Sequence, residues 1–267
     1  MRKPLILCAL AIAVVGGCTS APRVGEIVGP SELESLAAAL AAGVPDAGSY
    51  RGTGDGEISV SGRTLGVSFA VVYERPGWLR ADLRPALGSL GASMTSLALM
   101  EGDCARFFFP ARLIVVNGCI SEIAPYRDWI DPASLILGLP DPYFITKLTG
   151  VTSSHRRGQL ILDGVLEDSR VRVSIDEERA VITGVELGRA GTEESINIEY
   201  GGHGWKVGSS VPRTIELLAL EGTSREVGIT LRYSTLRGGE PIDRDAHALA
   251  IPEGVLEVNW QELNLWR

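Results

Sequence analysis

Basic residues are scarce in this chain of 267 residues. It contains 25 Lys and Arg against 33 Asp and Glu, which gives a net charge of −8 at pH 7. A surface that binds nucleic acid or anionic lipid headgroups needs clustered positive charge, and the sequence shows no basic cluster. We therefore expect no nucleic-acid partner.

The motifs of catalysis are missing as well. The three histidines, His155, His203 and His247, are far apart, and none has a Cys, His or carboxylate at ligand spacing, so the sequence predicts no zinc site. No Gly-x-Ser-x-Gly elbow, phosphate-binding loop or calcium-binding loop is present. The carboxylate pairs 177–178 and 193–194 fall in expected turns, which gives no acid/base dyad. We expect a protein that is not an enzyme and that has no metal or other cofactor.

A single long apolar run is present, at the N-terminus. Arg2 and Lys3 precede an apolar stretch from Leu5 to Val15, which is too short and too close to the N-terminus for an ordinary membrane span. Basic residues followed by such a stretch are typical of a secretory signal. Since no second run follows and 45% of the residues are hydrophobic, we expect the rest to fold as a soluble globule with an ample core.

The segment that ends this signal, Val15-Gly16-Gly17-Cys18, resembles the lipobox of bacterial lipoproteins. In that motif a hydrophobic residue and two small residues precede a cysteine, which is acylated as the signal is removed. The resemblance implies that residues 1–17 are a signal peptide and that Cys18 carries a diacylglycerol and an N-acyl group such as palmitate. Several acyl chains make membrane attachment nearly permanent. The alternatives are an ordinary cleaved signal peptide with a chance cysteine, and a retained membrane anchor.

The residues after the cysteine indicate where the anchor lies. In enteric bacteria an aspartate directly after it favours the inner membrane, whereas this chain has Thr19, so we expect a lipid anchor in the outer membrane that faces the periplasm. Residues 18–30 are small and polar and contain proline, which is typical of a tether. Loss of Arg2 and Lys3 takes the net charge from −8 to −10. Residues 31–267 contain no evident linker and are expected to form a single domain.

The domain is expected to begin with a helix. Ser31 and Glu34 are spaced as a capping box, and apolar residues then recur at helical spacing until Gly43. A second, short apolar helix is predicted from Asp131 to Leu139, just before Pro140.

The rest of the domain shows period-two alternation that is broken by glycine and polar turns, which predicts short sequential strands. Sequential strands with tight connections are typical of antiparallel meanders. The predicted strands are 56–60, 65–73, 78–83, 95–101, 104–109, 113–117, 149–155, 159–166, 171–175, 181–187, 195–200, 214–220, 227–233 and 255–258.

Two cysteines remain in the predicted domain, Cys104 and Cys119. If residues 107–109 and 113–115 pair as a hairpin centred on 111–112, the two cysteines lie directly opposite each other. Cross-strand neighbours on one face come close enough for a disulfide, and the expected compartment permits one. We therefore expect a disulfide between them; the alternative is two free, buried thiols.

The order of parts, a helix, a meander, a helical insertion and a second meander, resembles the LolA/LolB-like fold of periplasmic lipoprotein carriers and outer-membrane receptors. The resemblance implies an α+β fold, with an unclosed antiparallel half β-barrel of about ten or eleven strands covered by a few helices. It also implies an apolar cavity that takes acyl chains. Residues at alternating positions could line it or serve as plain core: Phe69, Val71, Leu97, Leu99, Phe107 and Phe109.

The segment Tyr73-Glu74-Arg75-Pro76-Gly77-Trp78-Leu79-Arg80 is similar to a strand-turn-strand segment of this family. In the carrier the arginine of its Arg-Pro pair is implicated in holding a closed lid, so the resemblance gives that role to Arg75. The alternative is a simple β-turn with a solvated arginine.

A second segment, residues 84–91, corresponds to a loop that protrudes in the receptor and carries a hydrophobic residue needed to release cargo into the membrane. Leu87 or Leu90 would have that role here, since a leucine on an exposed glycine-rich loop has little packing reason to be there. The alternative is that both leucines fold back onto the sheet.

These expectations lead to one function and one alternative. The first is an outer-membrane lipoprotein, LolB-like, that binds acyl chains of a lipid or lipoprotein and assists their insertion into the membrane. The alternative is an envelope binding or sensor module on the same fold that contacts a protein partner without lipid transfer. A permanent anchor at Cys18 suits either role, whereas a soluble carrier has no use for one.

Overall fold

The computed structural model describes residues 25–43, 48–60, 62–85, 96–101, 104–119, 137–189, 194–203, 211–221 and 224–259. Cys18, Leu87 and Leu90 lie outside these ranges, so their roles stay predictions. The elements are β1 (Glu26–Ile27), α1 (Pro30–Gly43), β2 (Ser49–Val60), β3 (Arg63–Glu74), β4 (Trp78–Pro85), β5 (Ser96–Glu101), β6 (Cys104–Phe109), η1 (Pro110–Arg112), β7 (Ile114–Cys119), η2 (Pro142–Lys147), β8 (Thr149–Arg156), β9 (Gln159–Leu166), β10 (Ser169–Asp176), β11 (Val181–Arg189), β12 (Glu194–Gly201), β13 (Thr214–Glu221), β14 (Ser224–Gly238), η3 (Asp245–His247) and β15 (Leu256–Asn259), where η denotes a 3-10 helix.

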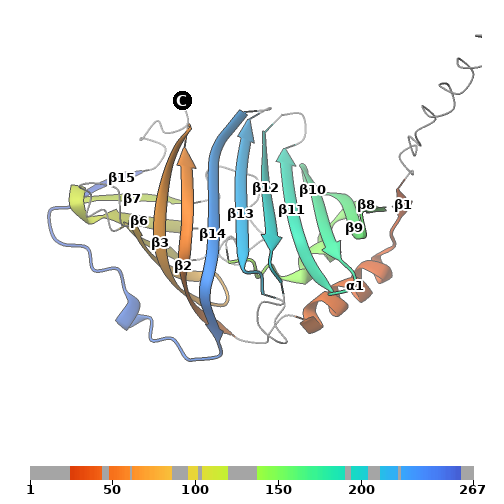
Figure 1. Cartoon of the computed structure of the whole chain (residues 1–267), viewed down its shortest axis with the longest axis horizontal. Coiled ribbons are helices and arrows are strands. Elements are labelled where there is room, and N and C mark those ends of the chain that lie inside the picture. Colours follow the sequence, from red (N-terminus) through yellow and green to blue (C-terminus); the bar gives the residue numbers. More distant parts are fainter. Residues whose placement is uncertain are drawn as a thin grey trace, which may run out of the picture.

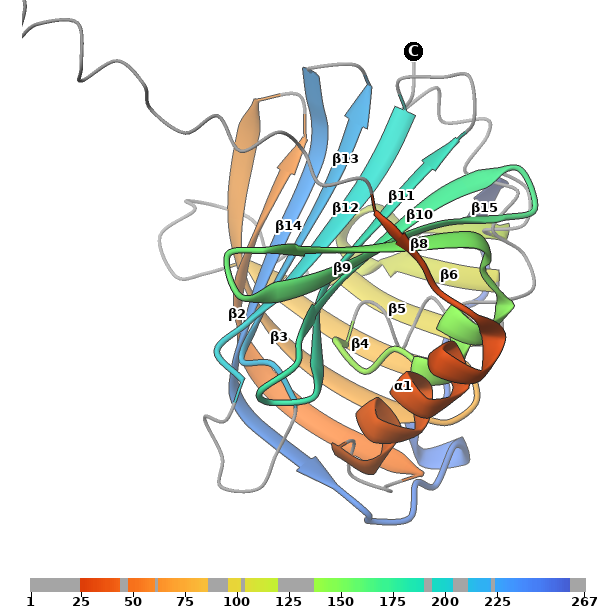
Figure 2. The same cartoon turned by 90° about the vertical axis from the view of Figure 1, so that its right-hand side faces the viewer.

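One sheet of fifteen strands forms the body of the molecule, in the order β1-β8-β9-β10-β11-β12-β13-β14-β2-β3-β4-β5-β6-β7-β15. The two edge strands do not pair with each other, and the sheet curls into an open half-barrel with α1 across its inner, concave side (Figure 1, Figure 2). This confirms the predicted unclosed half-barrel. The sheet has more strands than the ten or eleven expected, and β1 beside β8 and β15 beside β7 extend its two edges.

The two meanders join through their longest strands. β14 pairs with β2 from Val227 opposite Val60 to Gly238 opposite Tyr50, so the end of the second meander continues the sheet into the start of the first. All neighbouring strands are antiparallel except β7 and β15, which are parallel. The strands in the middle of the half-barrel therefore come from distant parts of the chain.

Helix α1 begins one residue before the predicted cap. Gly29 precedes the helix, and its N–H donates to Glu32 Oε2 at 2.8 Å. Pro30 takes the first helical position, where its fixed φ suits the helix and its missing N–H costs nothing. The predicted capping box of Ser31 with Glu34 is therefore wrong, and the carboxylate that reaches back is that of Glu32.

Residues 25–29 lie against the sheet and not in a free tether. β1 pairs with β8, and the Val28 N–H donates to the Val151 carbonyl oxygen at 3.0 Å. These bonds give partners to backbone groups at an edge that would otherwise be open. Residues 26–28, which fall within the predicted tether 18–30, therefore pair with the edge of the sheet.

The second predicted helix falls largely outside the described residues, which exclude 131–136. Residues 137–140 form a turn, and Asp141 then begins η2, with its Oδ1 accepting from the Tyr143 N–H at 3.0 Å. Among the described residues, no helix is both long and apolar enough to cross a membrane.

Cys104 and Cys119 form the predicted disulfide, which links β6 to β7. They lie directly opposite each other, and the same register pairs Phe109 with Ile114. The hairpin is therefore centred where the sequence predicts, with η1 in its turn.

Residues 239–255 form a strap that crosses the outer side of the sheet between β14 and β15 (Figure 1). Arg80 Nη1 donates to the His247 carbonyl oxygen at 3.0 Å, and Arg244 forms an ion pair with Glu74. These contacts fix the strap against β3 and β4, so that it brings β15 to the free edge of β7.

Candidate functional site

Side chains alternate between the two faces of the sheet, and the faces have opposite character. On β10, Val171, Val173 and Ile175 are buried, whereas Arg170 and Arg172, which alternate with them, are exposed. Successive side chains of a strand point to opposite sides, so the apolar set faces the concave side and the charged set the convex side. An apolar ligand would therefore bind on the concave face.

The protein's own helices cover one end of the concave face. Leu33, Ala37 and Leu40 of α1 belong to the same buried cluster as the inward side chains of the strands, and so do Phe144 and Ile145 of η2. The apolar stripe predicted for α1 is thus confirmed, and this end of the face is closed by the protein itself.

The other end of the concave face carries an aliphatic row that the protein covers only in part. Leu65, Ile58, Ile229 and Leu217 lie opposite one another on β3, β2, β14 and β13, and we call these four residues the rim row. Leu65 is 42% exposed and the other three are half-buried. A contiguous apolar row left open to solvent is typical of a binding surface.

An aromatic cluster lies further along the same strands, towards the end that α1 covers. It consists of Phe69, Tyr233, Tyr50 and Tyr73, all at most 4% exposed. The Phe69 and Tyr233 rings meet edge to face, with centroids 5.4 Å apart, and the Tyr50 and Tyr73 rings stack at 6.3 Å. Both geometries are favourable for aromatic pairs. The exposure of inward side chains therefore falls from the rim row to zero at Tyr233.

Strand β2 makes room for two of these rings. Gly52 and Gly54 take inward positions, opposite Val71 and Phe69. A Cβ at Gly54 would lie 2.6 Å from Phe69 Cζ, and one at Gly52 would lie 3.0 Å from Tyr233 Cε1. The two rings thus lie directly on the backbone of β2.

Sequence reasoning missed Tyr233 and these glycines. Glycine at alternate positions of a strand, as at Gly52, Gly54 and Gly56, marks a close approach to the backbone and is the signal that could have found them. Burial raises the pKa of the Tyr233 hydroxyl, and its oxygen has no hydrogen-bond partner among the described residues.

The structure divides the residues predicted to line the cavity. Phe69 and Val71 face the concave side, and Phe107 and Phe109 occupy positions of the same face by register. Leu97 and Leu99 do not, because they pair with Asp82 and Arg80 on the convex face, so the prediction for these two residues was wrong. A shift of one residue in register moves every position of a strand to the other face, and the sequence leaves the β4–β5 register open.

Arg75 lies in the turn between β3 and β4. Its N–H donates to the Gly48 carbonyl oxygen at 2.8 Å. Its Nη2 is buried without a hydrogen-bond partner among the described residues. Most of the predicted helix from Asp131 to Leu139 is outside those residues, so the lid contact of Arg75 stays a prediction.

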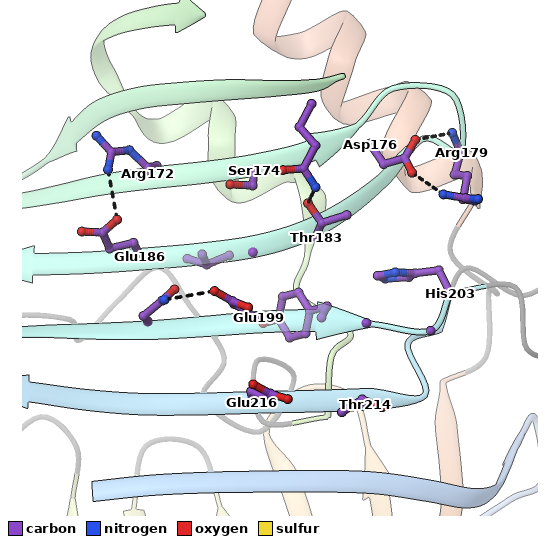
Figure 3. A pocket seen from close by; sticks show the side chains of 17 residues that line it. Arg172, Ser174, Asp176, Arg179, Thr183, Glu186, Glu199, His203, Thr214 and Glu216 are labelled. Carbon is purple, nitrogen blue, oxygen red and sulfur yellow. Dashed lines mark hydrogen bonds and ion pairs between the residues drawn. The ribbon is translucent and has the colours of Figure 1, made fainter. Parts of the chain in front are cut away.

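The convex face of β10 to β13 carries a polar hollow of about 680 Å³ (Figure 3). Arg172 bridges two carboxylates, with Nε 2.8 Å from Asp163 Oδ1 and Nη1 3.2 Å from Glu186 Oε2. Partial burial lowers the pKa of Arg172, but the two carboxylates more than offset this effect, so that its pKa lies above the usual value. This part of the hollow is a network of paired charges.

At the end of the hollow, Asp176 accepts hydrogen bonds from Arg179, one of them from Nη1 at 2.6 Å. Burial raises the pKa of Asp176, but these bonds outweigh it and leave the pKa below its usual value. His203 lies nearby in the turn that follows β12, and burial lowers its pKa. These groups suit a polar ligand and not an acyl chain.

Two carboxylates of the hollow have no ion-pair partner among the described residues. Glu199 and Glu216 are directly opposite each other on β12 and β13, and neither makes an ion pair with any described residue. Like charges in this position repel each other. Within the described residues, no group of three or more His, Cys, Asp or Glu is placed to hold a metal ion.

Known structures share this architecture. A DUF1329 family protein from Desulfovibrio piger is 12% identical and covers 82% of this chain and 96% of its own, with a TM-score of 0.54. A Vibrio parahaemolyticus domain described as an outer membrane lipoprotein-sorting protein is 11% identical. The match covers 82% of this chain and 97% of that domain, with a TM-score of 0.51. A LolA superfamily protein from Nitrosomonas europaea is 10% identical. The match covers 81% of this chain and 97% of that protein, with a TM-score of 0.51. No protein-family model and no curated protein matches the chain. The chain has the LolA/LolB-like fold.

Proposed function

We propose that this chain is an envelope lipoprotein that binds acyl chains of a lipid or lipoprotein on its concave face and assists their insertion into the outer membrane. The rim row carries this proposal. Its four aliphatic residues lie on the face that is otherwise the buried core, yet they stay partly open to solvent. An apolar chain laid along this row would complete the burial.

Burial alone can supply the affinity. Each methylene removed from water contributes about 0.8 kcal/mol, so a long acyl chain needs no covalent chemistry to bind tightly. This is why we propose a binding protein, with no catalytic residue and no cofactor.

The end of β4, from which the chain continues towards Leu87 and Leu90, is at the same end of the sheet as the rim row. Pro85, the last residue of β4, pairs with Val67, which is two residues along β3 from Leu65 of the rim row. Strand β4 therefore ends beside the rim row, two residues before Leu87 in the sequence. Together with an acylated Cys18, these leucines would hold that end near the membrane.

Native mass spectrometry tests the proposal. The mature chain with Cys18→Ser removes the protein's own acyl groups, and it is offered a synthetic lipopeptide or the same peptide without its acyl chains. We expect a complex with the lipopeptide and none with the control peptide. A protein that stays empty with both peptides contradicts the proposal.

The convex hollow favours the alternative function. Glu199 and Glu216 repel each other, and a cationic side chain of a protein partner would relieve that repulsion. The alternative predicts that Glu199→Gln with Glu216→Gln weakens capture of an envelope partner and leaves lipopeptide binding unchanged. Loss of lipopeptide binding in this variant would contradict it.

A further inference from the structure

The hollow on the convex face has a floor of two small residues. Ser174 and Gly184 lie directly opposite each other on β10 and β11, and both line the hollow. A Cβ at Gly184 would lie 3.7 Å from Ser174 Cβ, so a side chain there would occupy part of this space. The hollow of about 680 Å³ is within the size range of ligand sites.

The charges that line the hollow do not balance (Figure 3). Its two arginines, Arg172 and Arg179, each form an ion pair with a carboxylate of the same lining. Glu199 and Glu216 raise the number of lining carboxylates to four, which leaves an excess of two negative charges. Burial lowers the pKa of His203, so this histidine adds no charge at pH 7. The hollow therefore suits a cation.

The two unpaired carboxylates lie in line with the floor. Gly184 is directly opposite Glu199, and Glu199 is directly opposite Glu216. Neither carboxylate forms an ion pair with a residue that the structure describes. A side chain that lies over the floor can therefore place its end group between the two carboxylates.

The same face already contains a cation that binds two carboxylates. Arg172 Nε lies 2.8 Å from Asp163 Oδ1, and its Nη1 lies 3.2 Å from Glu186 Oε2. A guanidinium carries five N–H donors in one plane, so a single group can donate to two carboxylates on different strands. The ammonium group of lysine is a point charge without this planar fork.

We propose that the hollow is the docking site for an arginine side chain of a protein partner. Its guanidinium binds Glu199 and Glu216, and its aliphatic part lies over Ser174 and Gly184. Charge complementarity selects the cation, and the pair of carboxylates on neighbouring strands selects the planar group. This inference rests on the alternative function, contact with an envelope protein, and does not depend on acyl binding at the concave face.

Nuclear magnetic resonance titration tests the docking site. A pentapeptide with one central arginine between glycine and serine residues is added at low salt to the isotope-labelled mature chain with Cys18→Ser. The comparison peptides have lysine, or citrulline as the neutral analogue, in place of arginine. We expect saturable shifts of backbone amides in β11 to β13 with the arginine peptide, about threefold weaker binding or less with lysine, and no shifts with citrulline. Added salt should weaken the binding.

Three variants locate the site. Glu199→Gln with Glu216→Gln should weaken binding of the arginine peptide by about tenfold, because charge-assisted hydrogen bonds are lost. Glu57→Gln is the matched control and should bind as the parent does, since Glu57 is an exposed carboxylate of the same convex row that lies outside the hollow. Ser174→Leu keeps every charge but fills the space over the floor, so it should also weaken binding.

The outcomes distinguish this site from general attraction to an acidic surface. An arginine peptide that does not bind, or that binds no better than the citrulline peptide, contradicts the proposal, and equal binding of the lysine peptide contradicts the choice of arginine. Unchanged binding in Ser174→Leu, or an equal loss in Glu57→Gln, contradicts docking in the hollow.

The chain itself could also supply the cation. Lys206 is the one basic residue of segment 204–210, which the structure does not describe. If the arginine peptide binds only after Lys206→Gln, the hollow is occupied by this lysine and docking of a partner is contradicted. Lipopeptide binding at the concave face is measured separately, so none of these results decides the acyl proposal.

Discussion

The two faces of strands β10 to β13 are made of alternate residues of the same segments, yet they are held together in different ways. Val173 and Val185 lie opposite each other on the concave face, both 0% exposed. Arg172 and Glu186 form the neighbouring pair on the convex face, with side chains that are 51% and 45% exposed. Full burial of a valine contributes about 1.5 kcal/mol or more, whereas an exposed ion pair contributes about 0 to 1 kcal/mol.

This difference separates stability from recognition. The concave face holds the sheet together wherever α1 and η2 cover it, and it becomes a binding surface where they do not, at the rim row. The convex face contributes little to stability, so its charges can be changed at small cost. Substitutions should therefore cost most on the crowded concave face and least on the exposed convex face.

The largest effect is expected from a side chain added at the centre of the concave face. Gly54→Val places a Cβ against Phe69 and against the Arg232 carbonyl oxygen. Overpacking costs about 1 to 3 kcal/mol and more where the backbone must move, so we expect the free energy of unfolding to fall by about 4 kcal/mol. Urea denaturation measures it. Gly48→Val, with nothing within 4 Å of its Cβ, is the matched control and should change stability by less than half as much.

Removal of the disulfide should have the next largest effect. Cys104 and Cys119 take convex positions on β6 and β7, and their sequence separation is 15 residues. Closing a loop of this length stabilises a fold by about 3 kcal/mol, mainly by restricting the unfolded chain. Cys104→Ser with Cys119→Ser should lower the free energy of unfolding by that amount. Non-reducing peptide mapping first establishes that the parent protein contains the disulfide. A urea midpoint that is the same in the parent and in the double variant would contradict this expectation.

Removal of a convex charge should matter much less. Arg172→Met leaves Asp163 and Glu186 without their shared cation. For a half-exposed network we expect a loss of about 1 kcal/mol at low salt, which shrinks as salt screens the charges. Arg170→Met on the same face is the control, and a loss as large as that of Arg172→Met would show that the network contributes nothing specific.

The smallest effect concerns pH. Burial lowers the pKa of His203 in the folded chain below its usual value of 6.5. As the pH falls below that value, the unfolded chain binds the proton first, so the protein loses stability until the folded pKa is passed. His203→Asn removes this loss. Between about pH 7 and about pH 5, the midpoint temperature of thermal unfolding should fall less steeply with pH in the variant than in the parent. Identical slopes in the two proteins would contradict the account. Asp176 and Arg179, which act on this histidine in opposite directions, stay in place.

The elements of the fold were predictable from the sequence because their signals are local. Alternating residues such as Val171, Val173 and Ile175 identify strands, and the symmetric spacing of Cys104 and Cys119 about their turn identifies the disulfide. The joining of β14 to β2 was not predictable, since no local pattern relates Tyr50 to Gly238. The β4–β5 register was not predictable either, and for this reason Leu97 and Leu99 were predicted on the wrong face.

The candidate site was predictable only in its chemistry. Alternation predicts that one face is apolar, and Phe69 and Val71 were recognised on that basis. The rim row depends on which part of that face the helices leave open, and this is a property of packing in three dimensions. Leu65 and Leu33 look alike in the sequence, yet the first is 42% exposed and the second 3%.

Two neighbouring leucines of β13 allow the most direct test of the central claim. Leu217 lies in the rim row on the concave face, and Leu218 lies opposite Asn197 on the convex face; both are half-buried. Myristoyl lysophosphatidylcholine binding is measured by calorimetry for Leu217→Asn and Leu218→Asn in the mature chain with Cys18→Ser. Acyl binding on the concave face predicts at least tenfold weaker binding in Leu217→Asn, from lost apolar contact and a buried amide, and less than twofold in Leu218→Asn. Equal affinities in the two variants, or a larger loss in Leu218→Asn, would contradict it.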